Sequence, residues 1–275
     1  MTNAATELGT TTSTISRQIS RLRAQLGLYP FVKTDGYWGL NPALADLIDA
    51  FEQADGILET ELGRLHRYSP AMKRDLKIGA PPTVLSHVLI PALHDLAQTA
   101  PGIRPVLESR VHENGLGSND LAVLFHPPQT GRLRIRRCAS LSFALFAPRD
   151  WQSGNGWVSL TDKYSGPYLD ARRRYFGSDP CLKVDSFTQA LQAMTRLGKA
   201  GALPVVVAAE VPGLIRLDTP ALDVSRDLYA LHHESRSNDP DIRAALDWIV
   251  RSLKTAETSA KRLQIAQDQL CVAER

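Results

Sequence analysis

The chain has 275 residues, enough for two domains, and its 43% hydrophobic and 22% charged residues are ordinary values for a folded protein. A net charge of +3 excludes a generally polycationic chain, so any nucleic-acid-binding signal has to be local. Three widely spaced cysteines argue against a disulfide framework or a zinc site and fit a cytoplasmic location. No apolar run approaches the roughly 18 residues of a membrane span, so we expect no membrane segment, no signal peptide and no membrane partner.

Residues 4–27, AATELGTTTSTISRQISRLRAQLG, have the order of a helix-turn-helix. The small side chains of Ala4 and Ala5, followed by Leu8, predict a short helix, and Gly9 suits a tight turn. The threonines that follow offer an N-cap for a second helix over residues 13–25. One face of this helix is apolar at helical spacing, with Ile15, Ile19, Leu22 and Leu26.

The opposite face carries Thr14, Arg17, Gln18 and Arg21, side chains that hydrogen-bond to base edges or phosphates. Residues 8–34 contain four basic side chains and no acidic one, as a helix that enters the major groove requires. An ordinary amphipathic helix with a solvated basic face is the alternative. The spacing of the turn and the missing acids favour a DNA-reading helix.

The stretch AATELGTTTSTISRQISRLRAQLGLYPFVKT resembles the winged helix-turn-helix of LysR-type transcriptional regulators, whose usual run is AAxxLxxSQPAVSxxIxxLExxLGxxLFxR. The resemblance implies a helix-rich DNA-binding domain over residues 1–41, with double-stranded promoter DNA as its partner. Together, the residues and the resemblance give these DNA-binding candidates: Thr11, Thr12, Ser13, Thr14, Ser16, Arg17, Gln18, Arg21 and Lys33.

This sequence departs from the family pattern in places. Thr12 and Ser13 replace the usual Gln-Pro, and the wing, DGYWGLNPAL, lacks the usual arginine. The family also has a further helix before the position of Ala4. We therefore expect either a start that lies upstream or a truncated and impaired domain. The second case would leave a ligand-binding protein that no longer binds DNA.

Residues 42–68, PALADLIDAFEQADGILETELGRLHRY, repeat apolar side chains every seven residues at Leu44, Phe51, Leu58 and Leu65. A sustained heptad predicts a helix–helix seam, and the acidic side chains between these positions argue against contact with DNA. In the resembled family this segment is the dimerisation helix, which implies a homodimer or homotetramer. A helix packed within its own domain remains the alternative.

After a polar stretch with a proline at residues 68–75, strand-like and helix-like patterns alternate, which predicts an α/β domain with a mostly parallel sheet. We expect strands over 76–80, 105–109, 120–125, 132–148, 201–209, 213–217 and 228–233. Helices are expected over 81–98, 187–198 and 239–253. Residues 255–275 are predicted to form an exposed amphipathic tail without an assigned function.

The phrases LKIGAPPTV, DLAVLF, PGLIRL and DIRAALDWIV resemble the effector-binding domain of the LysR family. The resemblance assigns residues 75–254 to a domain similar to type 2 periplasmic binding proteins, with two α/β lobes joined by two crossing strands and a small-molecule effector in the cleft. In such sheets, ligands sit where strands end and helices begin. The implied effector-binding candidates are Thr83, Ser86, Phe125, His126, Pro167, Tyr168, Ser186 and Thr188.

Plainer roles remain open for several of these residues. Thr83 and Ser186 could simply cap helices, and His126 could be a solvated loop residue. The run Arg172–Arg174 could attract an anionic effector, although a solvated basic surface is the simpler interpretation.

Enzyme signals are weak. The chain contains no GxGxxG, P-loop, HExxH or GxSxG pattern, and His232–His233 has no nearby set of catalytic partners. We expect a regulator without catalytic activity, cofactor or metal. An enzyme built on the two-lobed fold is a third alternative.

Overall fold

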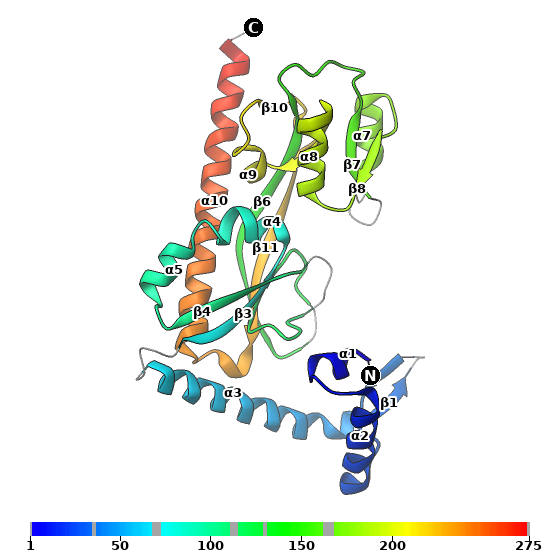
Figure 1. Cartoon of the computed structure of the whole chain (residues 1–275), viewed down its shortest axis with the longest axis vertical. Coiled ribbons are helices and arrows are strands. Elements are labelled where there is room, and N and C mark those ends of the chain that lie inside the picture. The colour runs from blue at the N-terminus through cyan, green and yellow to red at the C-terminus, as the bar shows by residue number, and fades with distance from the viewer. Residues whose placement is uncertain are drawn as a thin grey trace. The chain divides into compact units, whose positions relative to one another are not determined.

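The computed structural model describes residues 2–34, 37–67, 73–110, 115–128, 131–161 and 168–273. The chain separates into two compact units, residues 1–69 and 70–275, and each is described by itself (Figure 1). The division falls within the polar stretch of residues 68–75 noted in the sequence, although residues 68–72 themselves lie outside the described part.

The first unit is a helix-turn-helix followed by a hairpin and a long helix, as the sequence predicts. Its elements are α1 (Thr2–Glu7), α2 (Thr12–Leu26), β1 (Phe31–Thr34), β2 (Tyr37–Leu40), η1 (Pro42–Leu44) and α3 (Ala45–Arg67). Gly9 joins α1 to α2 with φ +59°, a left-handed conformation that glycine adopts without strain. The wing is the antiparallel pair β1–β2, in register from Phe31 opposite Leu40.

In its described residues, the second unit is a nine-stranded sheet covered by helices. Its strands are β3 (Arg74–Ala80), β4 (Ile103–Ser109), β5 (Leu121–Leu124), β6 (Leu133–Pro148), β7 (Trp157–Leu160), β8 (Leu182–Val184), β9 (Ala200–Pro204), β10 (Leu214–Arg216) and β11 (Val224–His233). The helices are α4 (Pro82–Val84), the π-helix η2 (Leu85–Leu89), α5 (Leu93–Thr99), α7 (Tyr168–Phe176), α8 (Phe187–Leu197), α9 (Val205–Ala208), η3 (Pro220–Leu222), η4 (Glu234–Arg236) and α10 (Pro240–Ala273).

The expectation of a mostly parallel sheet is wrong. Strands run in the order β4-β3-β5-β11-β6-β9-β7-β8, with β10 against β6. The pairs β3–β4, β3–β5, β7–β8 and β7–β9 are parallel, whereas every pair that involves β6 or β11 is antiparallel. The parallel pairs belong to two α/β lobes, and the long antiparallel strands β6 and β11 join them (Figure 1). The two crossing strands that the family resemblance implies are therefore present.

Proline explains two smaller corrections. The helix expected over residues 81–98 is interrupted, since Pro91 has no N–H to donate and α5 begins only at Leu93. The strand expected over residues 201–209 ends at Pro204, and the three valines that follow form α9 instead.

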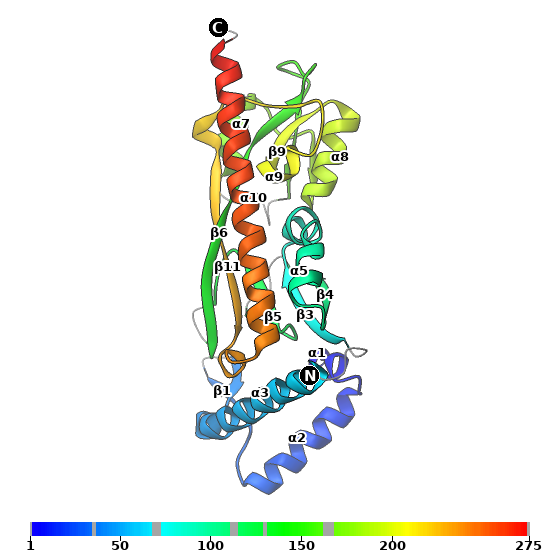
Figure 2. The ribbon, with the colours of Figure 1, turned by 90° about the vertical axis from the view of Figure 1, so that its left-hand side faces the viewer.

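The last helix is longer than the sequence predicts. α10 continues without a break from Pro240 to Ala273 and runs along the crossing strands (Figure 2). Ala260 is buried in the core of the second lobe, so the start of the expected tail at residue 255 is not a structural boundary. Trp248 and Ile249, in the first third of the helix, belong to the core of the first lobe.

Candidate DNA-reading helix and effector site

α2 begins where the threonine run predicts. Thr11 is its N-cap, and the Thr11 hydroxyl accepts a hydrogen bond of 3.2 Å from the backbone N–H of Thr14. Gly27 ends the helix in the left-handed conformation, with its N–H donating to the carbonyl of Arg23. The sequence therefore fixes both ends of the helix locally.

The polar face of α2 is exposed. Arg17, Gln18 and Arg21 are exposed, Thr14 is half-buried, and none of them has an acidic partner within the described chain. Ile15 on the opposite face is buried. An exposed face of this kind, whose donors are uncompensated, can approach phosphates and base edges.

The remaining DNA-binding candidates surround this face. Thr12, Ser13 and Ser16 are exposed in the first turns of α2, and the Thr11 hydroxyl is occupied by its capping contacts. Lys33 is exposed on β1, opposite Trp38 of β2. Arg23 is held differently, because its guanidinium lies 3.7 Å from the ring centre of Tyr29.

Aromatic side chains gather where the two lobes meet. The rings of Phe125 and Phe143 lie 6.4 Å apart, and those of Phe143 and Phe187 lie 5.5 Å apart. Tyr168 packs against the same apolar core as Phe125 and Phe187. The structure thus brings together two expected effector-site residues, Phe125 and Tyr168, and adds two that the sequence analysis missed. Phe143 and Phe187 give no signal in the sequence beyond their place in a strand and at a helix start.

The other effector-site candidates have different surroundings. Ser186 caps α8 by accepting from the N–H of Gln189 at 3.3 Å, which is the plainer of its two expected roles. Thr83 does not cap, because the N-cap of α4 is Pro81. Ser86, His126 and Thr188 are exposed, and Pro167 lies outside the described residues. No contact joins these polar side chains to one another within the described chain.

The interpretation of the run Arg172–Arg174 as solvated surface is wrong for its first member. Arg174 is exposed, and Arg173 forms ion pairs with Asp170 and Asp179, at 3.0 Å and 2.6 Å. Arg172 is buried, and burial lowers the pKa of its guanidinium. Helical spacing explains the difference, since Arg172 shares the inward face of α7 with Leu169.

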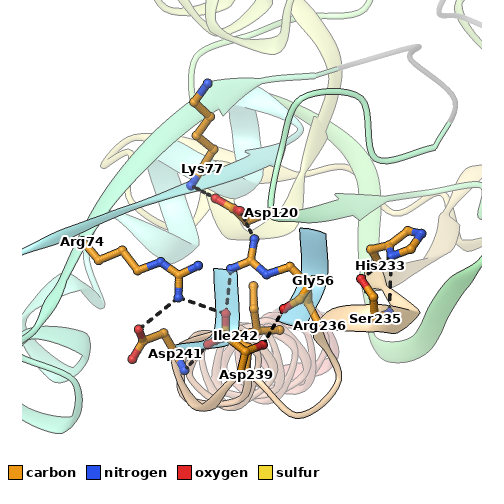
Figure 3. A network of polar contacts seen from close by, with 11 residues as sticks. Gly56, Arg74, Lys77, Asp120, His233, Ser235, Arg236, Asp239, Asp241 and Ile242 are labelled. Atoms are coloured by element: carbon orange, nitrogen blue, oxygen red, sulfur yellow. Dashed lines mark hydrogen bonds and ion pairs between the residues drawn. The ribbon is translucent and has the colours of Figure 1, made fainter. Parts of the chain in front are cut away.

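A second group of buried charges has a structural role (Figure 3). Arg74 of β3 lies 2.9 Å from Asp239 and 3.3 Å from Asp241, and Arg236 bonds both Asp239 and Asp120. Asp239 also accepts from the first N–H groups of α10. Burial alone would raise the pKa of Asp239, but the hydrogen bond from Arg236 and the two arginine charges outweigh it and lower that pKa. Mutual pairing makes this network an anchor for α10 rather than a ligand site.

His232 and His233 have structural contacts. His232 is buried at the end of β11, and the ring of His233 lies 2.7 Å from the Ser235 hydroxyl, where it caps η4 (Figure 3). Among the described residues, no group of three or more histidine, cysteine or acidic side chains is placed to hold a metal ion. Within the same residues, none of the helices has both the length and the apolar character needed to cross a membrane.

Comparison with known proteins identifies the family. Residues 71–254 match the model of the LysR substrate binding domain, and no curated protein matches the chain by sequence. Among solved structures, ArgP from Mycobacterium tuberculosis is similar at 16% identity and a TM-score of 0.60, covering 91% of this chain and 90% of that one. CrgA, a LysR-type transcriptional regulator from Neisseria meningitidis, is similar at 19% identity and a TM-score of 0.55, covering 91% and 92%.

Full-length CbnR complexed with its target DNA is also similar, at 19% identity and a TM-score of 0.51, covering 92% of this chain and 93% of that one. At these identities the structures establish a shared fold. The family model spans more than half of the chain, and its start at residue 71 agrees with the start of the two-lobed unit at residue 70. The chain therefore belongs to the LysR family.

Proposed function

We propose that this chain is a sequence-specific DNA-binding transcriptional regulator whose DNA binding changes when a small molecule binds the effector domain. The exposed face of α2 carries the proposal, because Arg17, Gln18 and Arg21 are free to reach a major groove. The similarity to a regulator solved with its target DNA supports the same use of the fold. A role on DNA would place the protein in the cytoplasm.

The effector is proposed to bind between the lobes, beside Phe125 and Tyr168. An effector changes DNA binding only if it favours one arrangement of the protein over another. The crossing strands β6 and β11 join the lobes, so a ligand that contacts both lobes can shift their arrangement.

A homodimer is proposed to form through α3. Its large apolar side chains remain exposed in the single chain, although Leu44 at the first heptad position is buried in η1. Those with more than half of their surface exposed are Phe51, Ile57, Leu58 and Leu65. Helix-turn-helix dimers read paired half-sites, so a seam along α3 fits the proposed function, and a tetramer would be a pair of such dimers.

DNA binding is tested by selecting duplexes from a random pool with the full chain and then measuring anisotropy against salt. A regulator should lose affinity steeply with salt, with a slope of about −0.9 per phosphate contact. Arg17→Ala should cost about 1–3 kcal/mol and relax the base preference, whereas Lys33→Ala should weaken all sequences alike. Arg174→Ala is the matched control, because Arg174 is an exposed arginine of the second unit. This substitution should change neither the affinity for DNA nor the base preference.

A ligand-binding protein without DNA binding is the second candidate. It is favoured by Leu8, directly after α1, which is 68% exposed, and by Leu22 of α2, which is 41% exposed, because these apolar side chains are incompletely covered. If the pool yields no enriched sequence and the selected and scrambled duplexes bind equally, the regulator proposal fails and this candidate replaces it.

The dimer is tested by light scattering across a range of concentrations. Leu58→Asp removes an apolar contact from each copy and should raise the dimer dissociation constant at least tenfold, since burying a leucine contributes roughly 1.5–3 kcal/mol. Gln53→Asp, an exposed polar position on the same helix, is the control. A wild-type chain that remains monomeric at high concentration would rule out the seam.

A further inference from the structure

Arg172 is a buried cation that has no ion-pair partner among the described residues. Its side chain is 9% exposed, its Nε has no hydrogen-bond partner, and it forms no ion pair with any described residue. Other buried arginines of this unit are compensated: Arg74 and Arg236 both pair with Asp239. An uncompensated buried guanidinium is costly, so its presence indicates that something else supplies the negative charge.

The surroundings of Arg172 disfavour its positive charge. Burial lowers the pKa of Arg172, the Tyr168 hydroxyl opposes that shift, and the charge of Arg226 on β11 adds to it. The guanidinium carbon of Arg172 lies 5.9 Å from the ring centre of Tyr168. Arg226 is half-buried and likewise has no hydrogen bond or ion pair within the described chain. Arg226 thus opposes the charge of Arg172, and neither arginine forms an ion pair with a described residue.

An independent observation comes from the strand beneath α7. Ser159 of β7 is 3% exposed, and its hydroxyl has no hydrogen-bond partner among the described residues. Trp157 on the same strand stacks on Phe176 of α7, with ring centres 4.9 Å apart. Alternation along a strand gives Ser159 the same face as Trp157, so the unpaired hydroxyl also faces the α7 layer. A buried hydroxyl and a buried guanidinium, both unsatisfied in one layer, are groups that bind anions.

We propose that the buried layer beneath α7, on the face of the sheet where Arg172 lies, binds a small anion bearing a carboxylate or a phosphate. Arg172 is its principal ion-pair partner, Arg226 contributes a second positive charge, and the Ser159 hydroxyl donates a hydrogen bond. This inference rests on the proposed function and deepens it, since Tyr168 is one of the expected effector contacts. It assigns the effector to the class of organic anions, with the charged group at α7.

The test is thermal unfolding of the full chain with sodium acetate, succinate, inorganic phosphate or chloride at equal ionic strength. At least one of the first three should raise the Tm saturably, because a ligand that binds only the native state stabilises it. Response to the two carboxylates but not to phosphate, or the reverse, identifies the charged group. Absence of a saturable response to all three overturns the proposal.

Variants locate the response. Arg172→Met should abolish it and leave the anion-free Tm unchanged or higher, because an unpaired buried charge is replaced by an apolar side chain of similar length. Arg174→Met, exposed on the same helix, should retain the response. A lower anion-free Tm in Arg172→Met with the response intact would mean that Arg172 is only structural, which contradicts the proposal.

Arg226→Gln keeps the proposal testable if Arg172→Met does not fold. The substitution should raise the dissociation constant of the anion about tenfold. An unchanged constant would show that Arg226 does not contribute to the anion site. These measurements use protein without DNA. Loss of the anion response therefore leaves the DNA-binding proposal standing, and a failure to bind DNA leaves the anion site standing.

Discussion

The two units of the chain bury their apolar side chains to different extents. In the second unit, residues 70–275, here also called the effector unit, Ile78 and Leu231 are fully buried and Trp248 is 1% exposed, whereas in the first unit Trp38 is 73% and Phe51 is 62% exposed. The effector unit closes a core of its own. The first unit takes its shape from caps and turns and leaves apolar surface for partners, so mutations in the two units should have different consequences.

The largest contrast is expected between core truncations. Trp248→Ala removes a buried ring whose Nε1 donates to the carbonyl of Ala92 at 2.8 Å, and should cost about 3–5 kcal/mol of unfolding free energy. Ile15→Ala in the smaller core of the first unit should cost about 2 kcal/mol, the low end for such a change. Urea unfolding followed by circular dichroism measures both. Equal losses would show that the first unit is as well packed as the second.

Close packing in the effector unit is tested at Gly79. A Cβ at this position would collide with the side chains of Asn119 and Arg110, so Gly79→Ala should cost about 1–3 kcal/mol through overpacking. Gly102→Ala is the matched control, because its Cβ would meet no atom within 4 Å, and should change stability by less than about 0.5 kcal/mol. If the two variants unfold at the same urea concentration, the close approach at Gly79 is not a constraint.

Local signals in the sequence predict the first unit well. The turn at Gly9, the cap at Thr11 and the left-handed end at Gly27 depend on nearest neighbours in the chain, and the structure has helices and hairpin where these signals place them. The strand pairing of the effector unit depends on distant segments. Nothing near Leu133–Pro148 specifies that it pairs antiparallel with β11, about 90 residues later, so the sheet was expected to be mostly parallel.

The candidate site shows the same limit. Helix starts at Ser186 and strand ends at Phe125 can be recognised along the chain, but the sequence does not distinguish a solvated arginine from a buried one. Arg172 and Arg174 look alike in the run Arg172–Arg174, and only the packing of α7 separates them. The pairing of Phe143 with Phe187 likewise depends on the fold.

Each unit has a helix whose N-cap is a hydroxyl side chain. Thr11 caps α2 and Ser186 caps α8 with the same type of hydrogen bond, and replacement of either by alanine should cost about 1 kcal/mol. Because Tm responds more in a smaller unit, Thr11→Ala should lower the first transition by about 4–8 °C and Ser186→Ala the second by about 2–4 °C. Calorimetry resolves the two transitions. Equal shifts would mean that the units unfold together.

The smallest effect is expected at an exposed ion pair of the effector unit. The hydrogen bonds from Arg137, at 2.7 Å and 2.8 Å, and from Ser140 lower the pKa of Asp227 to about 2. A carboxyl whose pKa falls on folding stabilises the protein above its unfolded pKa, and this contribution is lost as pH falls from about 4 to about 2.

Asp227→Asn should therefore be slightly less stable than the wild type at pH 5, and the difference should vanish near pH 2. The side chains are exposed, so salt should shrink the effect. Ser140→Ala removes one hydrogen-bond donor to Asp227 and keeps Arg137, so the pKa of Asp227 should be lowered less. The pH range over which the stabilisation by Asp227 is lost should therefore move to higher pH. The stability difference between Asp227→Asn and the wild type is measured from the midpoints of urea unfolding at pH 5, 4, 3 and 2. A constant difference across this range would show that Asp227 contributes by packing rather than by charge.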